Sequence, residues 1–370
     1  MKHNSVCCIY NTSLHYRWPI FKALSDNFDI DFCFGTDTVY SKSIKTFDPS
    51  RLPGYRRQLK NRRLFGKFYW QGGAVAMAFK PYKKYLLLGE AYCLSSWIIA
   101  LLAKLLGKKT VCWTHGWYGR ESRSKKIVSK WFYSLFDNIL TYNEYAADLL
   151  AAGGISRKKI DIIGNSLDTA KHRLMRLQLR KTSVYSDRFG NDNPVLLYCG
   201  RIQKSKRLEL LIEAASRLKS THKNVNLVFV GKDDEQVDLE TVAANHGILA
   251  ETWFYGPCYD EEKLAELFYN ATACVSPGNV GLTAVHSLSF GCPVITHDNL
   301  PFQGPEFESI RPGVTGDFFR QNDVDDLKRV IEKWLCRSDE EREAVAKAAF
   351  NEIDRMWNVD YQLSVFRCVL

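Results

Sequence analysis

Short apolar runs recur along the whole chain, and stretches with helical periodicity separate most of them. Runs such as VCCIY and VLLYC are near-continuously apolar, which is typical of strands buried on both faces of a parallel sheet. Helices are expected between them, most clearly at 91–106 and 124–136. The pattern predicts strands at 5–10, 29–35, 84–89, 109–114, 138–142 and 159–164, and again at 194–200, 226–231, 252–256, 272–277 and 293–297.

The two series of strands lie on either side of a polar, basic interval. Alternating strands and helices favour α/β domains, and 370 residues are too many for one ordinary core. We therefore expect two doubly wound, Rossmann-like domains facing a central cleft, because ligands bind at the carboxyl ends of such strands. The expected divisions are an N-terminal domain at 1–168, a linker at 169–193, a C-terminal domain at 194–350 and a C-terminal helix at 351–370. Whether that helix packs on the first domain stays open.

Composition indicates a soluble globular protein. Apolar residues make up 46% of the chain and charged residues 25%, as in soluble globular proteins. The 11 cysteines form no CxxC pair, which argues against a zinc or redox motif and favours reduced thiols in a cytoplasm. No export signal is evident at the N-terminus, and the longest apolar run, 91–108, is interrupted by Lys104 and reads as a buried helix.

Charge is distributed unevenly between the two halves. Residues 1–165 hold 26 basic and 11 acidic side chains, whereas the remainder holds 25 and 30. A basic half indicates a polyanionic partner, either nucleic acid or an anionic membrane. No recognisable nucleic-acid-binding module is present, so we expect no nucleic acid partner.

The stretch SPGNVGLTAVHSLSFGCPVITHDN, residues 276–299, has the pattern of a strand end, a glycine-bearing turn, a helix and a strand. The helix is expected to begin near Leu282, so free backbone N–H groups at Gly281, Leu282 and Thr283 and the helix dipole favour a bound anion. The cations are expected from another loop, at Arg201 and Lys206, which follows the strand ending at 200.

Residues 194–310 resemble, segment by segment, the nucleotide-sugar half of family 4 glycosyltransferases of the GT-B fold, including those that build bacterial surface glycans. The resemblance covers the second domain strongly and the first diffusely. In the first domain it rests on WTHG (113–116) and IIGNSLD (162–168). In the second it rests on CGRIQKSKRLELLIEA, LVFVGKDDE, WFYGPCYDEEKLAELFYNATACVSP, GLTAVHSLSFGCPVI and GPEFESIRPGVTG.

The resemblance implies roles for several residues. Arg201 and Lys206 would bind the donor diphosphate together with Gly281, Leu282 and Thr283, and the nucleoside would contact Tyr255 and Gly256. No metal ligands are expected, and no cofactor, because the nucleotide-diphosphate sugar is itself a substrate. Retention of anomeric configuration is favoured over inversion.

One motif of the family is absent. The usual E-x7-E pair falls on Gly278 and His286, so both acids are missing. Two interpretations of His286 stay open: a hydrogen bond to ribose, which adds it to the nucleoside-binding set, or a packed helix histidine. Asn279, beside the first missing acid, offers an amide to the sugar.

Candidates for acceptor chemistry lie mostly in the first domain. His115 is expected at a strand end, where it either holds a sugar hydroxyl or acts as the catalytic base. Glu144 and Glu306 are sugar or acceptor candidates, each with a helix-start role as the alternative. The spacing of Arg56, Lys60, Arg63 and Lys67 predicts one basic face of a helix, next to aromatic residues, that contacts an anionic membrane surface.

The sequence therefore predicts a metal-independent glycosyltransferase that moves a sugar from a nucleotide-diphosphate sugar to a glycan or lipid-linked glycan. We expect it in the cytoplasm, at the inner face of the plasma membrane. Two alternatives remain: another GT-B enzyme such as a sugar-nucleotide epimerase, and a non-catalytic polyanion-binding protein.

Overall fold

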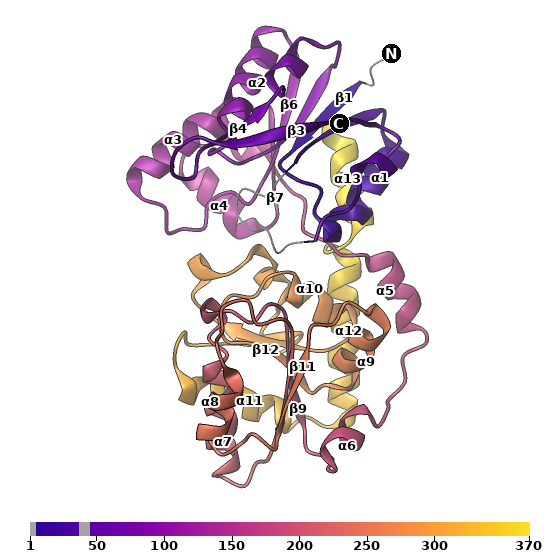
Figure 1. Cartoon of the computed structure of the whole chain (residues 1–370), viewed down its shortest axis with the longest axis vertical. Helices are drawn as coiled ribbons and strands as arrows, with labels where there is room; N and C mark the ends of the chain where they lie inside the picture. Colours follow the sequence, from indigo (N-terminus) through magenta and orange to yellow (C-terminus); the bar gives the residue numbers. More distant parts are fainter. Residues whose placement is uncertain (1–4, 37–44) are drawn as a thin grey trace. The chain divides into compact units, whose positions relative to one another are not determined.

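The computed structural model describes residues 5–36 and 45–370. The chain divides into two compact units (Figure 1), one made of Met1–Asp168 and Asn358–Leu370 and the other of Thr169–Trp357. Each unit is a sheet covered by helices, as the alternating pattern predicts.

The first unit contains an eight-stranded sheet in the order β4-β3-β2-β1-β5-β6-β7-β8. All neighbouring strands are parallel except β3 and β4, which form an antiparallel hairpin at one edge. The strands are β1 (Val6–Tyr10), β2 (Ile30–Gly35), β3 (Tyr55–Arg63), β4 (Tyr69–Gly72), β5 (Lys84–Leu88), β6 (Lys109–Thr114), β7 (Asn138–Thr141) and β8 (Ile160–Ile162).

Two apolar clusters, one on each face of this sheet, form the core of the first unit. The main helices are α1 (Trp18–Asn27), α2 (Leu94–Leu105), α3 (Arg123–Ser134), α4 (Glu144–Ala152) and α13 (Val359–Val369). One cluster contains residues of α2, α3 and α4, and the other contains residues of α1 and α13. Strands β1 and β2 are buried at every position; β1 is a continuous apolar run, and β2 contains one charged residue, Asp31.

The last helix of the chain packs on the first unit. In Figure 1, α13 runs beside α1, and the two helices are in contact. The buried Phe366 ring lies 5.2 Å from the Trp113 ring, centroid to centroid. Gln362 donates to the carbonyl of Gly164 and accepts from the Ser166 hydroxyl, so α13 is fixed by polar as well as apolar contacts.

The second unit contains a six-stranded, all-parallel sheet in the order β11-β10-β9-β12-β13-β14. Its strands are β9 (Val195–Cys199), β10 (Asn226–Val230), β11 (Thr252–Gly256), β12 (Ala273–Ser276), β13 (Val294–His297) and β14 (Gly316–Phe319). Its helices are α5 (Thr169–Arg176), α6 (Val184–Phe189), α7 (Glu209–Lys219), α8 (Leu239–Asn245), α9 (Glu261–Asn270), α10 (Leu282–Ser289), α11 (Val324–Leu335) and α12 (Asp339–Arg355).

The secondary structure agrees with the predicted strands and with both named helices, but it corrects two predictions. Residues 54–70, expected as a basic helix, form β3 and the turn to β4. The helical spacing of the cations was misleading because β2 and β4 on either side complete the backbone hydrogen bonds of β3, and Leu59 inserts into the core. The interval 169–193, expected as a linker, contains α5 and α6.

Within residues 5–36 and 45–370, the structure has no helix with the length and apolar character required to cross a bilayer.

Candidate functional site

Two loops meet at the point where the winding of the second sheet reverses direction. Strands β9 and β12 are neighbours in the sheet. From β9 the chain continues to β10 on one side, and from β12 it continues to β13 on the other side, so the loops after β9 and β12 lead away from each other. Such a switch point is where doubly wound sheets bind ligands. The residues predicted to hold the donor diphosphate lie in these two loops.

Lys206 joins the two loops. Its ammonium group donates to the backbone carbonyl of Asn279 at 2.7 Å and to the Asn279 side-chain oxygen at 3.1 Å. The backbone N–H of Gly278 in turn donates to the Lys206 carbonyl at 2.7 Å. A Cβ atom at Gly278 would lie 2.2 Å from the Ser205 carbonyl oxygen, so this close approach requires glycine.

Lys206 and Arg201 form a pair of like charges. Burial, followed by the charge of Arg201, lowers the pKa of Lys206 to about 8, while the carboxylate of Glu306 acts in the opposite direction. The Arg201 side chain is exposed, and within the described ranges no hydrogen bond or ion pair to another side chain occupies its guanidinium. Two neighbouring cations, one of them desolvated, are the electrostatic signature of an anion site.

Helix α10 begins beside these cations. Gly281 is its N-cap, and Leu282 and Thr283 form its first turn, as predicted. The Thr283 hydroxyl donates to the Cys199 carbonyl at 2.9 Å, so it ties α10 to the end of β9. Glu306, in the short helix Pro305–Ser309, is 3% exposed, and its carboxylate lies 3.9 Å from the Cβ position of Gly281.

The predicted nucleoside-binding residues lie on β11 and α10. Tyr255 and Gly256 end β11, where Gly256 has a φ of +83° that favours glycine. His286 lies one turn along α10 from Leu282, and its Nε2 atom is 3.0 Å from Oε2 of Glu261. Sequence reasoning gave Glu261 no role.

A second histidine completes this group. Nε2 of His172, on α5, lies 3.2 Å from the same oxygen of Glu261. Burial raises the pKa of the Glu261 carboxyl, but hydrogen bonds from His172 and His286 outweigh this and hold that pKa well below its usual range. The three residues are 25 to 114 positions apart in the chain, so spacing gave no signal for the group.

In the first unit, His115 directly follows β6. Its imidazole lies 4.6 Å from the Tyr142 ring, centroid to centroid. Desolvation by the surrounding protein, followed by the charge of Arg17, lowers the pKa of His115 to about 4. The ring keeps its solvent access because it lines a cavity, and it is neutral at physiological pH.

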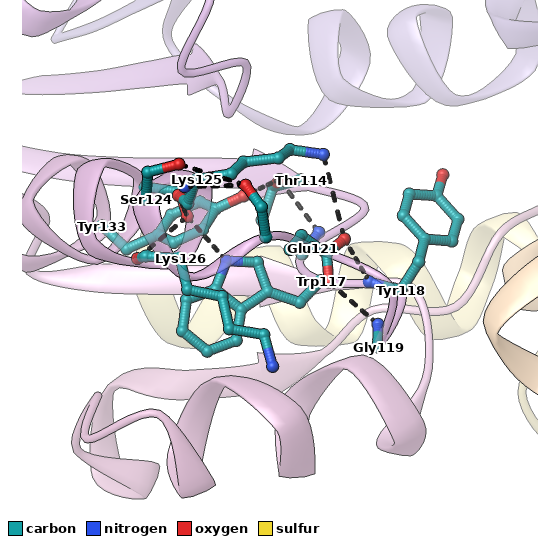
Figure 2. Close-up of polar contacts among 12 residues, drawn as sticks. Thr114, Trp117, Tyr118, Gly119, Glu121, Ser124, Lys125, Lys126 and Tyr133 are labelled. Atoms are coloured by element: carbon teal, nitrogen blue, oxygen red, sulfur yellow. Dashed lines mark hydrogen bonds and ion pairs between the residues drawn. The ribbon is translucent and has the colours of Figure 1, made fainter.

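The loop after β6 is held in a fixed conformation (Figure 2). The carboxylate of Glu121 accepts from the backbone N–H groups of Tyr118 and Gly119 at 2.8 and 2.9 Å. At the other end of the loop, the Thr114 hydroxyl accepts from the backbone N–H of Gly116 at 3.1 Å. These contacts fix the position of the intervening residues, including His115.

The cavity that His115 lines has a volume of about 480 Å³. Its wall is mostly apolar and aromatic, with Phe68, Tyr92, Trp117 and Val128 among the residues present. Glu90 is a polar exception: burial raises the pKa of its carboxyl, which accepts from the Tyr69 hydroxyl at 2.8 Å. The cavity lies between the loop after β5 and the loop after β6.

Other predicted residues have structural partners. Glu144 begins α4 and forms an ion pair with Arg157 at 2.8 Å. Arg56 forms an ion pair with the buried Asp31 at 2.7 Å. Lys60, Arg63 and Lys67 are exposed on β3 and the following turn.

Two family models match the chain, and together they extend over both units. Residues 43–171 match the model described as Glycosyltransferase Family 4, and residues 181–352 match the model described as Glycosyl transferases group 1. The chain belongs to the family 4 glycosyltransferases.

Curated relatives carry matching descriptions. The chain is 26% identical over 254 residues to the putative glycosyltransferase EpsD of Bacillus subtilis (strain 168), a match that covers 65% of each protein. It is 28% identical over 229 residues to a glycogen synthase of Mycobacterium tuberculosis (strain CDC 1551 / Oshkosh), covering 60% of this chain and 51% of the relative. The chain thus spans less than two thirds of the length of these relatives.

Solved structures share the fold. Anabaena Alr3699/HepE in complex with UDP superposes with a TM-score of 0.74 at 13% identity, over 98% of this chain and 99% of that one. The apo form of the lipopolysaccharide outer core galactosyltransferase WaaB superposes with a TM-score of 0.69 at 14% identity, over 98% of both chains. The architecture of this family 4 member is the predicted GT-B fold.

The lowered pKa of Lys206 predicts how anion binding depends on pH. Because Lys206 must be protonated to attract an anion, affinity should be constant below about pH 7 and fall as pH rises through 8, by roughly tenfold at pH 9. Calorimetric titration with sulfate, whose charge is constant over this range, measures the effect. Lys206→Arg should remove the dependence, and an unchanged profile in that variant would contradict the assignment.

Proposed function

We propose that this protein transfers a sugar from a nucleotide-diphosphate sugar, bound by the second unit, to an acceptor bound by the first. The observation that carries the proposal is the meeting of Lys206, Arg201 and the N-terminus of α10 at one switch point. Two neighbouring cations beside a helix N-terminus suit a diphosphate.

Glycosyl transfer requires stabilisation of the diphosphate as it leaves. A fixed cation pair and a helix N-terminus supply this stabilisation because they need no reorganisation during the reaction. In our proposal these groups replace a metal ion at the phosphates. Family resemblance supports retention of anomeric configuration.

The cavity beside His115 is the proposed acceptor site. A neutral imidazole accepts a hydrogen bond from an acceptor hydroxyl, which suits the first predicted role of His115, holding a sugar hydroxyl. Its lowered pKa makes it a weak base, which disfavours the alternative role. The mostly apolar wall favours an acceptor with an apolar portion, such as a lipid-linked glycan. We therefore favour a role in polysaccharide or cell-surface glycan synthesis.

The surface of the first unit supports peripheral contact with an anionic membrane. Helices α2 and α3, which touch through Trp97 and Phe132, both expose large apolar side chains. These are Ile98, Leu101, Leu105 and Leu106 around α2, and Ile127, Val128 and Trp131 on α3. On β3, side chains alternate between the two faces of the sheet, so Arg63 shares the face of Leu59, which packs with these helices, and Lys60 points to the opposite face. Exposed apolar residues together with Arg63 and the exposed Lys67 of the following turn are typical of interfacial binding. We place the protein at the cytoplasmic face of the plasma membrane.

A sugar-nucleotide epimerase is the second candidate, because the two acids of the E-x7-E motif are replaced by Gly278 and His286. The two activities differ in their need for an acceptor. A transferase releases nucleotide in proportion to acceptor, whereas an epimerase changes the donor sugar with no acceptor present.

Removing Lys206 should abolish most turnover. Charge-assisted hydrogen bonds contribute about 1.5–3 kcal/mol each, so Lys206→Ala should slow nucleotide release by roughly 10- to 150-fold. The donor is first identified by thermal stabilisation with a panel of nucleotide sugars. Lys204→Ala, which removes an exposed cation from the same loop, is the control. Equal rates for the two variants would contradict the diphosphate assignment.

Membrane association should depend on the hairpin cations and on α3. Replacing Arg63 and Lys67 by Gln should weaken binding to vesicles with anionic lipid by about 1 kcal/mol per residue, or roughly 30-fold in total. Trp131→Ala should weaken binding further. Replacement of Lys219 and Lys223, exposed in the second unit, should have no effect. Equal binding of wild type to neutral and anionic vesicles would exclude the proposal.

A further inference from the structure

Three side chains from three helices of the second unit converge on one point. His172 comes from α5, Glu261 is the first residue of α9, and His286 is on α10. Both imidazoles direct Nε2 at the same carboxylate oxygen, at 3.2 and 3.0 Å. The three potential ligand atoms all lie within 4.8 Å of one another.

The residue types and spacing suit a transition metal. Two imidazole nitrogens and one carboxylate oxygen are a ligand set that zinc uses in proteins, with a fourth position left for water. Bonds of about 2.0–2.2 Å in tetrahedral geometry place ligand atoms roughly 3.3–3.5 Å apart. The observed Nε2–Oε2 separations of 3.0 and 3.2 Å are therefore close to those of a formed site.

The surroundings fix the ligands and leave a route for the ion. The rings of Phe268 and Phe290 pack against the histidines, with centroids 5.0 Å from His286 and 4.9 Å from His172 respectively. The two imidazole planes are nearly parallel, 10° apart, with centroids separated by 5.2 Å. The Glu261 side chain is 34% exposed, so an ion reaches the carboxylate from solvent.

We propose that His172, Glu261 and His286 bind a divalent transition metal ion of the Zn²⁺ type. The ion replaces the protons that the imidazoles otherwise share with the carboxylate. By linking α5 to α9 and α10 it stabilises the second unit, because an ion that binds only the folded state adds its binding free energy to folding. This site is separate from the cation pair proposed to hold the diphosphate.

Metal binding is tested with the full chain after removal of metal by a chelator. We expect Zn²⁺ to bind with one equivalent per chain in calorimetry, to raise the melting temperature, and to displace Co²⁺ that gives visible ligand-field absorption. Glu261→Gln and His286→Gln should each weaken Zn²⁺ binding by at least about 100-fold, since changes to outer-shell partners alone cost roughly 10–100-fold.

Matched controls separate this site from adventitious binding. Glu262→Gln alters the neighbouring, exposed acid, and His246→Gln alters an exposed histidine on another helix end, so both should bind Zn²⁺ as the wild type does. The proposal is overturned if the wild type shows neither saturable binding nor Co²⁺ absorption, or if Glu261→Gln binds as tightly as Glu262→Gln. No donor or acceptor is present in these measurements, so their failure leaves the proposed transferase activity standing.

Discussion

The contact between the Lys206 ammonium and the Asn279 turn is the interaction on which the proposed donor site depends. It joins the loops that follow β9 and β12, and the Gly278 N–H returns a hydrogen bond to the same lysine. The ammonium is thereby held, partly desolvated, beside the first turn of α10. Because the two loops are fixed to each other, the charges are in place before any ligand arrives, which is the condition for electrostatic preorganisation.

This packing excludes a side chain at the first position of the family motif. The first motif acid would occupy position 278, where the loop 205–206 leaves no room for a side chain. Carboxylates nevertheless lie close to α10, but they come from other segments: Glu306 near its first turn and Glu261 against His286 one turn later. Two acidic groups thus lie near this helix although the turn around Lys206 has no room for one.

The sequence predicted most of the strands and the approach of Arg201 and Lys206 to α10, because each depends on a local pattern or a recognisable motif. Prediction from the sequence failed where contacts between distant residues determine the structure. The cations of β3 have helical spacing, yet pairing with β2 and β4 makes the segment a strand. The group of His172, Glu261 and His286 and the cavity beside His115 arise from residues far apart in the chain, which no spacing rule connects.

The central claim is that the cation pair and the α10 N-terminus recognise the second phosphate of a nucleotide. Calorimetric comparison of a nucleoside diphosphate with the corresponding monophosphate tests it most directly. The account predicts that the diphosphate binds at least about tenfold more tightly, and that Lys206→Ala removes this difference while leaving monophosphate affinity nearly unchanged. Equal affinity of the wild type for the two nucleotides would contradict it.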